Sequence, residues 1–228
     1  MTSPTLAPIS DHASPGDAEK RRGFGPRVRR LHARIGRAHH QAEGMTFSRS
    51  LLDGNATPRQ LAALIRALTP AYGQLETLAP EAAARLGSSS IPWSDLARHA
   101  ALKQDRDQLA ALPATPPSAA TGLWLERLSQ LAATAPHRLM AHVYVRYGGD
   151  LSGGQQLAPF AAAILAAHGQ PDLGFWRFPQ PVADLRQHLH DGIEALTLSP
   201  GQEEELLEEA EAALRLTHRL LAELETLA

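Results

Sequence analysis

One stretch decides how this chain folds: Tyr147-Gly148-Gly149-Asp150-Leu151-Ser152-Gly153-Gly154-Gln155. It places four glycines within seven residues, between apolar segments at 141–145 and 157–167 that are typical of helices. Each glycine inside a helix costs about 1 kcal/mol relative to alanine, so four cost roughly 4 of the ~5–15 kcal/mol that stabilise a domain. Such a helix either bends or brings its backbone close to a flat or bulky group. The alternative is an ordinary turn between two helices.

The pattern outside this stretch predicts an all-α protein with one domain. Apolar residues recur every three or four positions from residue 27 onward, and no segment shows the alternation of a strand. Ser199 followed by Pro200 is typical of a helix start. Residues 1–26, rich in Pro, Ser, Gly and Ala, are interpreted as a disordered leader, so the domain is expected to span 27–228. We expect helices from 27 through at least 42, at 45–52, from 58, at 93–110, 120–135, 137–147 and 151–168, and from 182 and 200 onward.

The composition is that of an ordinary globular protein and excludes several functional classes. The net charge is −2 in 228 residues, which gives no general attraction to nucleic acid or to an anionic membrane. The chain has no cysteine, so disulfides, thiolate metal sites and thiol nucleophiles are excluded. No apolar run reaches the ~20 residues that span a bilayer, and the N-terminus lacks the apolar core of a signal peptide. These features predict a cytoplasmic protein that does not enter membranes.

Residues 151–155, Leu-Ser-Gly-Gly-Gln, coincide with the signature peptide of ABC-transporter ATPases. That function requires a phosphate-binding G-x-x-x-x-G-K-[ST] loop after a strand. The chain has only two lysines, Lys20 and Lys103, and neither follows a glycine. The ATPase interpretation is therefore excluded.

Two neighbouring histidines on the first helix raise the question of a metal ligand. His39 follows Ile35 by one turn and lies toward the apolar face, whereas His40 is about 100° away and is expected to face solvent. Glu43 lies one turn after His39, where its carboxylate can orient the imidazole. This arrangement suits a single-histidine ligand, as for haem iron. The alternative is an exposed His–Glu pair on a surface helix.

Several polar side chains fall within apolar helical segments: Tyr72, Tyr144, Arg146 and Asp150. Arg146 and Asp150 are four residues apart, so one interpretation is an exposed ion pair. A buried Asp150 next to the glycines would instead indicate a functional carboxylate, because burying a lone carboxylate is costly.

The two regions together resemble the haem oxygenase family. Residues 38–47, Ala-His-His-Gln-Ala-Glu-Gly-Met-Thr-Phe, are similar to its H-x-x-A-E-x-x-x-F proximal helix. Residues 144–154, Tyr-Val-Arg-Tyr-Gly-Gly-Asp-Leu-Ser-Gly-Gly, are similar to its Y-x-R-Y-x-G-D-L-S-G-G distal helix. Both occur in the family's order and separation, and the resemblance covers residues 27–228. It implies a helical bundle whose distal helix is kinked at its glycines.

The resemblance also implies roles for individual residues. His39 would be the axial ligand of haem iron, with Glu43 as its hydrogen-bond partner. Asp150 would anchor a water network that includes Tyr72 and Arg146. The remaining residues expected to contact the cofactor are Tyr144, Gly149, Gly153, Arg186, His190 and His32. Two of the three basic positions are histidines, which are weaker and pH-dependent anchors, and Thr217 stands where some members have an asparagine.

The function implied is that of a haem oxygenase, which uses haem b as both cofactor and substrate. With O2 and an external electron donor it would release biliverdin, CO and ferrous iron. The resemblance implies a soluble donor such as a ferredoxin, and the bilin could pass to a bilin-accepting photoreceptor. Two alternatives stay open: a non-catalytic haem carrier or sensor on the same fold, and a helical interaction protein that no longer binds haem.

Overall fold

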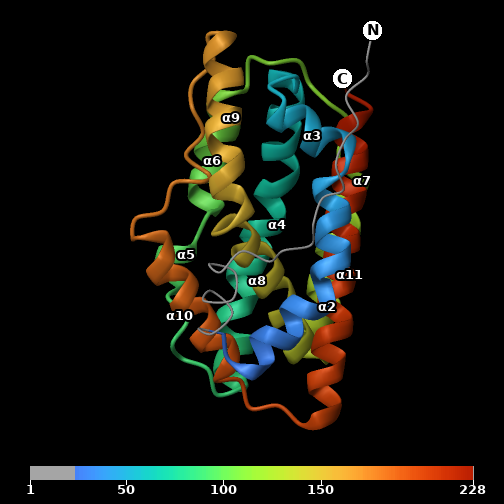
Figure 1. Ribbon diagram of the computed structural model, residues 1–228, viewed down its shortest axis with the longest axis vertical. Coiled ribbons are helices and arrows are strands. Elements are labelled where there is room, and N and C mark those ends of the chain that lie inside the picture. The colour runs from blue at the N-terminus through green and yellow to red at the C-terminus, as the bar shows by residue number, and fades with distance from the viewer. Residues whose placement is uncertain (1–23, 228) are drawn as a thin grey trace, which may run out of the picture.

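The computed structural model describes residues 24–227, and these residues form helices and no strands (Figure 1). Most of the predicted leader, residues 1–23, lies outside the described residues. No helix within 24–227 is long and apolar enough to cross a membrane. In chain order the helices are α2 Pro26–Glu43, α3 Thr46–Leu52, α4 Pro58–Arg85, α5 Trp93–Leu96, α6 His99–Gln108, α7 Ala119–Thr134, α8 Pro136–Asp150, α9 Gly153–Ala167, α10 Val182–Glu194 and α11 Pro200–Glu225.

The two longest helices begin at matching capping boxes. Thr57 Oγ1 accepts the Gln60 amide, and the Gln60 side chain accepts the Thr57 amide, at the start of α4. Ser199 and Gln202 repeat this arrangement at the start of α11, which confirms the predicted helix start. Each box satisfies amides that have no partner within the helix, and a proline at the first position needs none.

Helix α8 is at the centre of the bundle. It packs against α4, α7, α9, α10 and α11, and its residues from Leu139 to Val145 are all buried. Helix α2 lies along α11, and both α2 and α8 pack against α10 and α11 (Figure 1). The helix with the His39–Glu43 motif and the helix with the glycines are therefore held by the same two neighbours.

Two predicted helices differ in detail from the structure. The segment at 93–110 is split into α5 and α6, because the Glu76 carboxylate accepts the amides of Arg98 and His99 at 2.6 and 2.9 Å and so begins a new helix there. The segment at 137–147 continues through Gly148 and Gly149 to Asp150, and the break falls at residues 151–152, where Ser152 has φ −124° and ψ −88°. The helical segment that contains the four glycines is thus bent after the first two of them.

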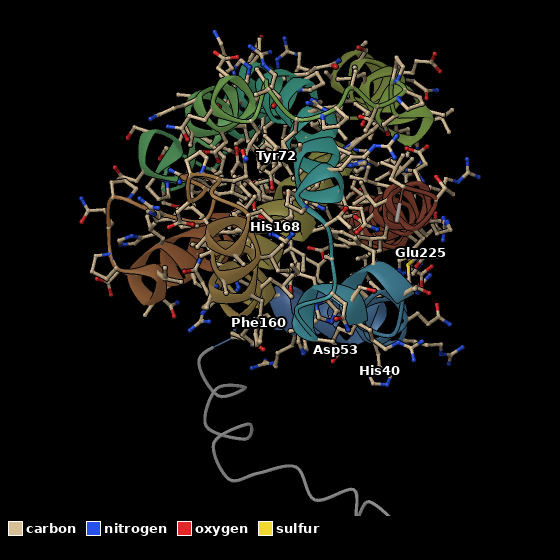
Figure 2. All side chains as sticks on the ribbon, turned by 90° about the horizontal axis from the view of Figure 1, so that it is seen from above. His40, Asp53, Tyr72, Phe160, His168 and Glu225 are labelled. Atoms are coloured by element: carbon tan, nitrogen blue, oxygen red, sulfur yellow. The ribbon has the colours of Figure 1, made fainter. Side chains whose placement is uncertain are left out.

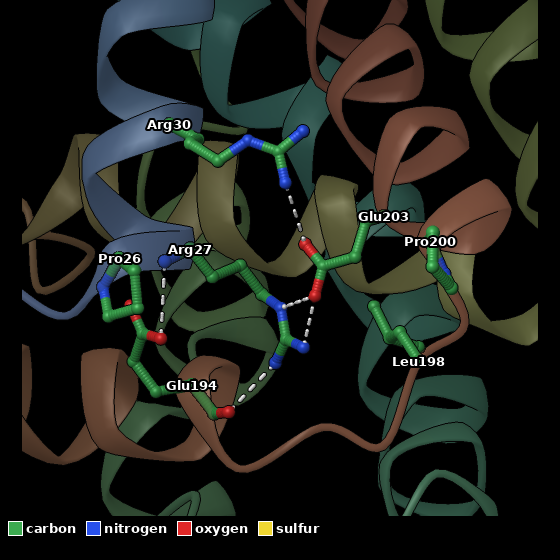
Figure 3. A pocket seen from close by; sticks show the side chains of 7 residues that line it. All are labelled: Pro26, Arg27, Arg30, Glu194, Leu198, Pro200 and Glu203. Carbon is green, nitrogen blue, oxygen red and sulfur yellow. Dashed lines mark hydrogen bonds and ion pairs between the residues drawn. The ribbon is translucent and has the colours of Figure 1, made fainter.

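The N-terminal end of α2 is anchored by charged groups from α10 and α11 (Figure 3). The Glu194 carboxylate accepts the amides of Arg27 and Val28 at 3.2 and 2.7 Å, in the place of an N-cap side chain. The Arg27 guanidinium donates to the carbonyls of Ile193 and Glu194 and to Glu203. Arg27, Glu194 and Glu203 also line a pocket of about 520 Å³, and none of the residues that line it is a predicted site residue.

Candidate functional site

Three polar side chains meet where α4 passes α8. The Tyr72 hydroxyl donates a hydrogen bond to Asp150 Oδ2, and Arg146 Nε donates to the Tyr72 oxygen over 3.4 Å. Arg146 Nη2 lies 3.8 Å from Asp150 Oδ1. Tyr72 is fully buried and Asp150 is only 3% exposed. The structure therefore excludes an exposed Arg146–Asp150 ion pair and places a buried carboxylate next to the glycines.

Burial controls the protons of this group. It raises the pKa of Asp150, and the nearby Arg146 and the hydrogen bond from Tyr72 oppose that rise. Burial also raises the pKa of Tyr72 well above 10, so the phenol stays protonated and remains a donor. The donors therefore point one way, from Arg146 to Tyr72 to Asp150. Among the described residues no hydrogen bond ends on Asp150 Oδ1, which leaves that oxygen to accept one from water or a ligand.

The network continues from Arg146 to α11. Arg146 Nη1 donates to Thr217 Oγ1 over 3.2 Å, and the guanidinium lies over the Trp124 ring at 5.2 Å from its centroid. Thr217 also donates to the Ala213 carbonyl of its own helix. Thr217, which stands where some haem oxygenases have an asparagine, is therefore a hydrogen-bond acceptor for Arg146.

A second set of contacts surrounds Tyr72 on its other side. The rings of Tyr147 and Phe175 approach Tyr72 edge to face at 5.7 and 5.6 Å, and Tyr147 Oη donates to Glu76 over 3.5 Å. Glu76 was not predicted as a site residue. Its position one turn after Tyr72 was the available signal, since residues four apart share a helix face.

The glycines at 148–154 have different surroundings. A Cβ added at Gly148, Gly149 or Gly153 would meet no heavy atom within 4 Å. A Cβ at Gly154 would lie 2.8 Å from Trp176 Cδ1, so this glycine lets the loop after α9 pack closely. Gln155 holds the same loop, because its amide donates to the carbonyls of Asp150 and Trp176 at 3.0 and 3.1 Å. Open space beside the backbone is thus found at Gly148, Gly149 and Gly153.

His39 lies near the C-terminal end of α2, and 48% of its side chain is exposed. Its Nδ1 is 3.4 Å from one Glu43 oxygen, and His40 Nδ1 is 3.4 Å from the other. His40 is 89% exposed and projects from the rim of the bundle, whereas Tyr72 lies inside (Figure 2). Glu43 therefore contacts both histidines, and His39 is the more sheltered of the two.

The predicted basic residues Arg186, His190 and His32 gather between α10 and α2. His190 is buried, and its ring packs edge to face on Phe24 at 4.8 Å and near Tyr144 at 6.2 Å. Burial, Arg186 and His32 together lower the pKa of His190 to about 4, so the ring is neutral near pH 7. Tyr144 belongs to this cluster and not to the Asp150 network, and burial raises its pKa.

The structure also contains a buried charged cluster that was not predicted. His142 Nδ1 accepts the Trp124 indole N–H at 3.1 Å, and His142 Nε2 bonds to Glu209, whose carboxylate also pairs with Arg127. Bonds to His142 and Arg127 outweigh burial and lower the pKa of Glu209 to about 2. The only signal was that His142 precedes Arg146 by one turn. Nothing distinguished Glu209 from the other glutamates of α11.

Comparisons with known proteins all lead to one family. A family model described as "Heme oxygenase" matches residues 28–223. Human heme oxygenase 1 is 32% identical over 206 residues, which cover 83% of this chain and 68% of that protein. The heme oxygenase of Rhodella violacea is 26% identical over 193 residues, which cover 82% of each chain.

Solved structures agree with the sequence comparison. The heme oxygenase of Leptospira interrogans superposes with a TM-score of 0.77 at 27% identity, over 87% of this chain and all of that one. Heme oxygenase-1 of the cyanobacterium Synechocystis, solved in complex with heme, gives 0.75 at 27% identity, over 89% of this chain and 93% of that one. The similarity therefore extends over nearly all of the described helices.

Proposed function

The chain belongs to the haem oxygenase family, and from this premise we propose that it cleaves haem to biliverdin, CO and ferrous iron, using O2 and external electrons. Haem b would be both its cofactor and its substrate. The observation that carries the proposal is the buried Tyr72–Asp150–Arg146 group beside glycines that face open space. A haem carrier needs an axial ligand but no such proton-holding group.

The residues of this chain fit a flat, anionic macrocycle at three points. His39 supplies an imidazole whose Nδ1 lies against Glu43, so Nε2 is the nitrogen that would hold the haem iron. Gly149 and Gly153 offer backbone without side chains, and a Cβ there would occupy open space. Arg186 supplies a charged donor of the kind that binds carboxylates, and His190 and His32 add ring nitrogens near it.

When bound, haem supplies an iron that reacts with O2 and the ring that is cut; the protein's residues control water and protons around it. Asp150 Oδ1 would hold a water by accepting its hydrogen bond. Tyr72 donates to Asp150 Oδ2 and so holds the carboxylate in one orientation, while Arg146 balances its charge. The rings of Tyr147 and Phe175 pack edge to face on Tyr72 and help to hold it in place. The result is a fixed chain of hydrogen bonds that ends on Asp150.

The proposal extends to the electron donor, the compartment and the use of the products. The electron donor would be a soluble protein such as a ferredoxin, and the reaction would take place in the cytoplasm. A bilin-accepting photoreceptor or an iron-acquisition pathway would use the products.

One experiment tests the proposal against its alternatives. Hemin is added to the purified protein at one equivalent, the Soret band is recorded, and ascorbate is supplied with catalase present. Loss of the Soret band with growth of a biliverdin band is expected. A stable reduced haem spectrum would instead indicate a carrier or sensor, and an unshifted hemin spectrum would contradict haem binding altogether.

A further inference from the structure

The half of α2 that contains His39 is held by few contacts. The buried side chains of α2 are Val28, Leu31 and Ile35, all in its first ten residues. The ion pairs between α2 and α11 also lie in the N-terminal half of α2, where Arg30 and Arg34 contact Glu204 at 3.3 and 3.0 Å. From Gly36 to Glu43 every side chain is exposed or half-buried. A helix end without buried side chains opens easily.

Two side chains from other helices reach the backbone of this half. His218 of α11 bonds through Nε2 to the Ala38 carbonyl at 2.7 Å, and Ser48 of α3 donates to the Ala42 carbonyl at 2.8 Å. Ser48 follows Ala42 closely in the chain, whereas His218 is 180 residues from Ala38. Because a carbonyl only accepts, His218 Nε2 must bear the hydrogen. His218 thus ties the segment before His39 to α11 by a hydrogen bond between residues far apart in the chain.

The residue next to His218 serves the opposite side of the site. Thr217 Oγ1 accepts from Arg146 at 3.2 Å, and Arg146 belongs to the Tyr72–Asp150 group. Neighbouring residues on a helix point about 100° apart, so one turn of α11 can reach both α2 and α8. Helices α2 and α8 each pack against α11, which makes this turn a common support.

We propose that His218 is a positioning residue that holds His39 at its place by fixing the Ala38 carbonyl to α11. The inference rests on the proposed axial role of His39. Together, His218 and Thr217 set the proximal helix and the distal network from a single turn of α11. His218 acts on His39 only through the backbone of α2, so its contribution is to geometry and not to the reaction itself.

The test compares two substitutions in the protein without haem and with it. His218→Leu removes the donor and keeps apolar bulk, whereas His218→Gln keeps an N–H donor. In the haem-free protein, hydrogen–deuterium exchange of amides 40–44 is expected to be about tenfold faster in His218→Leu, which is what one hydrogen bond contributes. His218→Gln should lie within about twofold of the wild type. Hemin release to an apomyoglobin acceptor should likewise be fastest from His218→Leu and close to the wild-type rate from His218→Gln.

His168→Leu is the matched control. His168, which caps the C-terminal end of α9, also bonds to a carbonyl, but to that of Ile164 one turn earlier, at 2.8 Å. This variant should leave exchange at 40–44 and hemin release unchanged. The proposal is overturned if amides 40–44 of His218→Leu exchange at the wild-type rate. It is also overturned if exchange there is accelerated equally in His218→Leu and His218→Gln, because the N–H donor would then make no difference. A wrong assignment of His39 as the haem ligand would be recognised by a different measurement. His39→Ala would then bind hemin with an unaltered spectrum, whatever the exchange data show.

Discussion

The two sides of the candidate haem site are built differently. The side formed by α4 and α8 is buried, and Tyr72, Asp150 and Arg146 are each fixed by at least one other member of the group. The side formed by the end of α2 is exposed, with His39 48% accessible and sharing Glu43 with His40. The side formed by α4 and α8 is therefore held by its own side chains. The side with His39, the proposed ligand, has few contacts besides the bond from His218 to the Ala38 carbonyl.

The difference indicates a division of labour. A buried carboxylate with a raised pKa needs a rigid setting, because a shift in its partners would change its proton affinity. His39, the proposed ligand, lies on a helix end that His218 ties to α11, and a bond to a metal would order that end further.

His39→Ala should have the largest effect on turnover and almost none on stability. Turnover with ascorbate is expected to fall at least ~1000-fold and to return in part when imidazole is added, because free imidazole can take the axial position. Since His39 is half-exposed, the free energy of unfolding of the haem-free protein should change by less than about 0.5 kcal/mol. His40→Ala, at an 89% exposed neighbour, is the control and should behave as wild type. Normal turnover in His39→Ala would remove it as the ligand.

Asp150→Ala should lower turnover about 100-fold while hemin still binds with a wild-type Soret band. Placing a proton correctly contributes about 100-fold or more to such reactions, and Asp150 is the acceptor on which the donor chain ends. Single-turnover absorbance measurements would show the loss. Asp107→Ala, at a carboxylate that is 67% exposed, is the control. If Asp150→Ala turned over at the wild-type rate, the assigned water position would be wrong.

The buried His190 should make the free energy of unfolding depend on pH. Its pKa is about 4 in the folded protein against 6.5 for an ordinary histidine, so protonation favours the unfolded chain. Its stabilising contribution is complete above pH 6.5 and is lost as the pH falls toward 4, by up to about 3 kcal/mol. Denaturant unfolding at pH 7, 5.5 and 4 should show this loss in the wild type and a smaller one in His190→Gln. Parallel curves for the two proteins would contradict the assignment.

The glycines give a matched pair of smaller effects. Gly154→Ala should destabilise the haem-free protein by about 1–3 kcal/mol, because its Cβ would collide with Trp176. Gly149→Ala should leave the haem-free protein at least as stable, since its Cβ meets open space and alanine favours the helix. Hemin affinity of Gly149→Ala should nevertheless fall about tenfold. Unchanged affinity would place the haem elsewhere.

The sequence predicts the helices well where local chemistry sets their ends. Ser199 starts α11 as the predicted capping residue, and the spacing of Arg146 and Asp150 puts both on one face of α8. It does not predict contacts that depend on how distant helices meet. Gly154 is needed because Trp176 packs on it, and Glu209 is distinguished from its acidic neighbours only because α8 brings His142 against it.

The measurement that tests the contrast most directly is amide hydrogen–deuterium exchange of the wild-type protein with and without hemin. Bound hemin is expected to slow exchange at residues 39–44 at least tenfold and to change exchange at 72–76 and 146–150 less than about threefold. That result would show a distal side already ordered and a proximal side ordered by the ligand. Strong new protection at 146–150 with none at 39–44 would contradict the account, because the distal network would then form only around the haem.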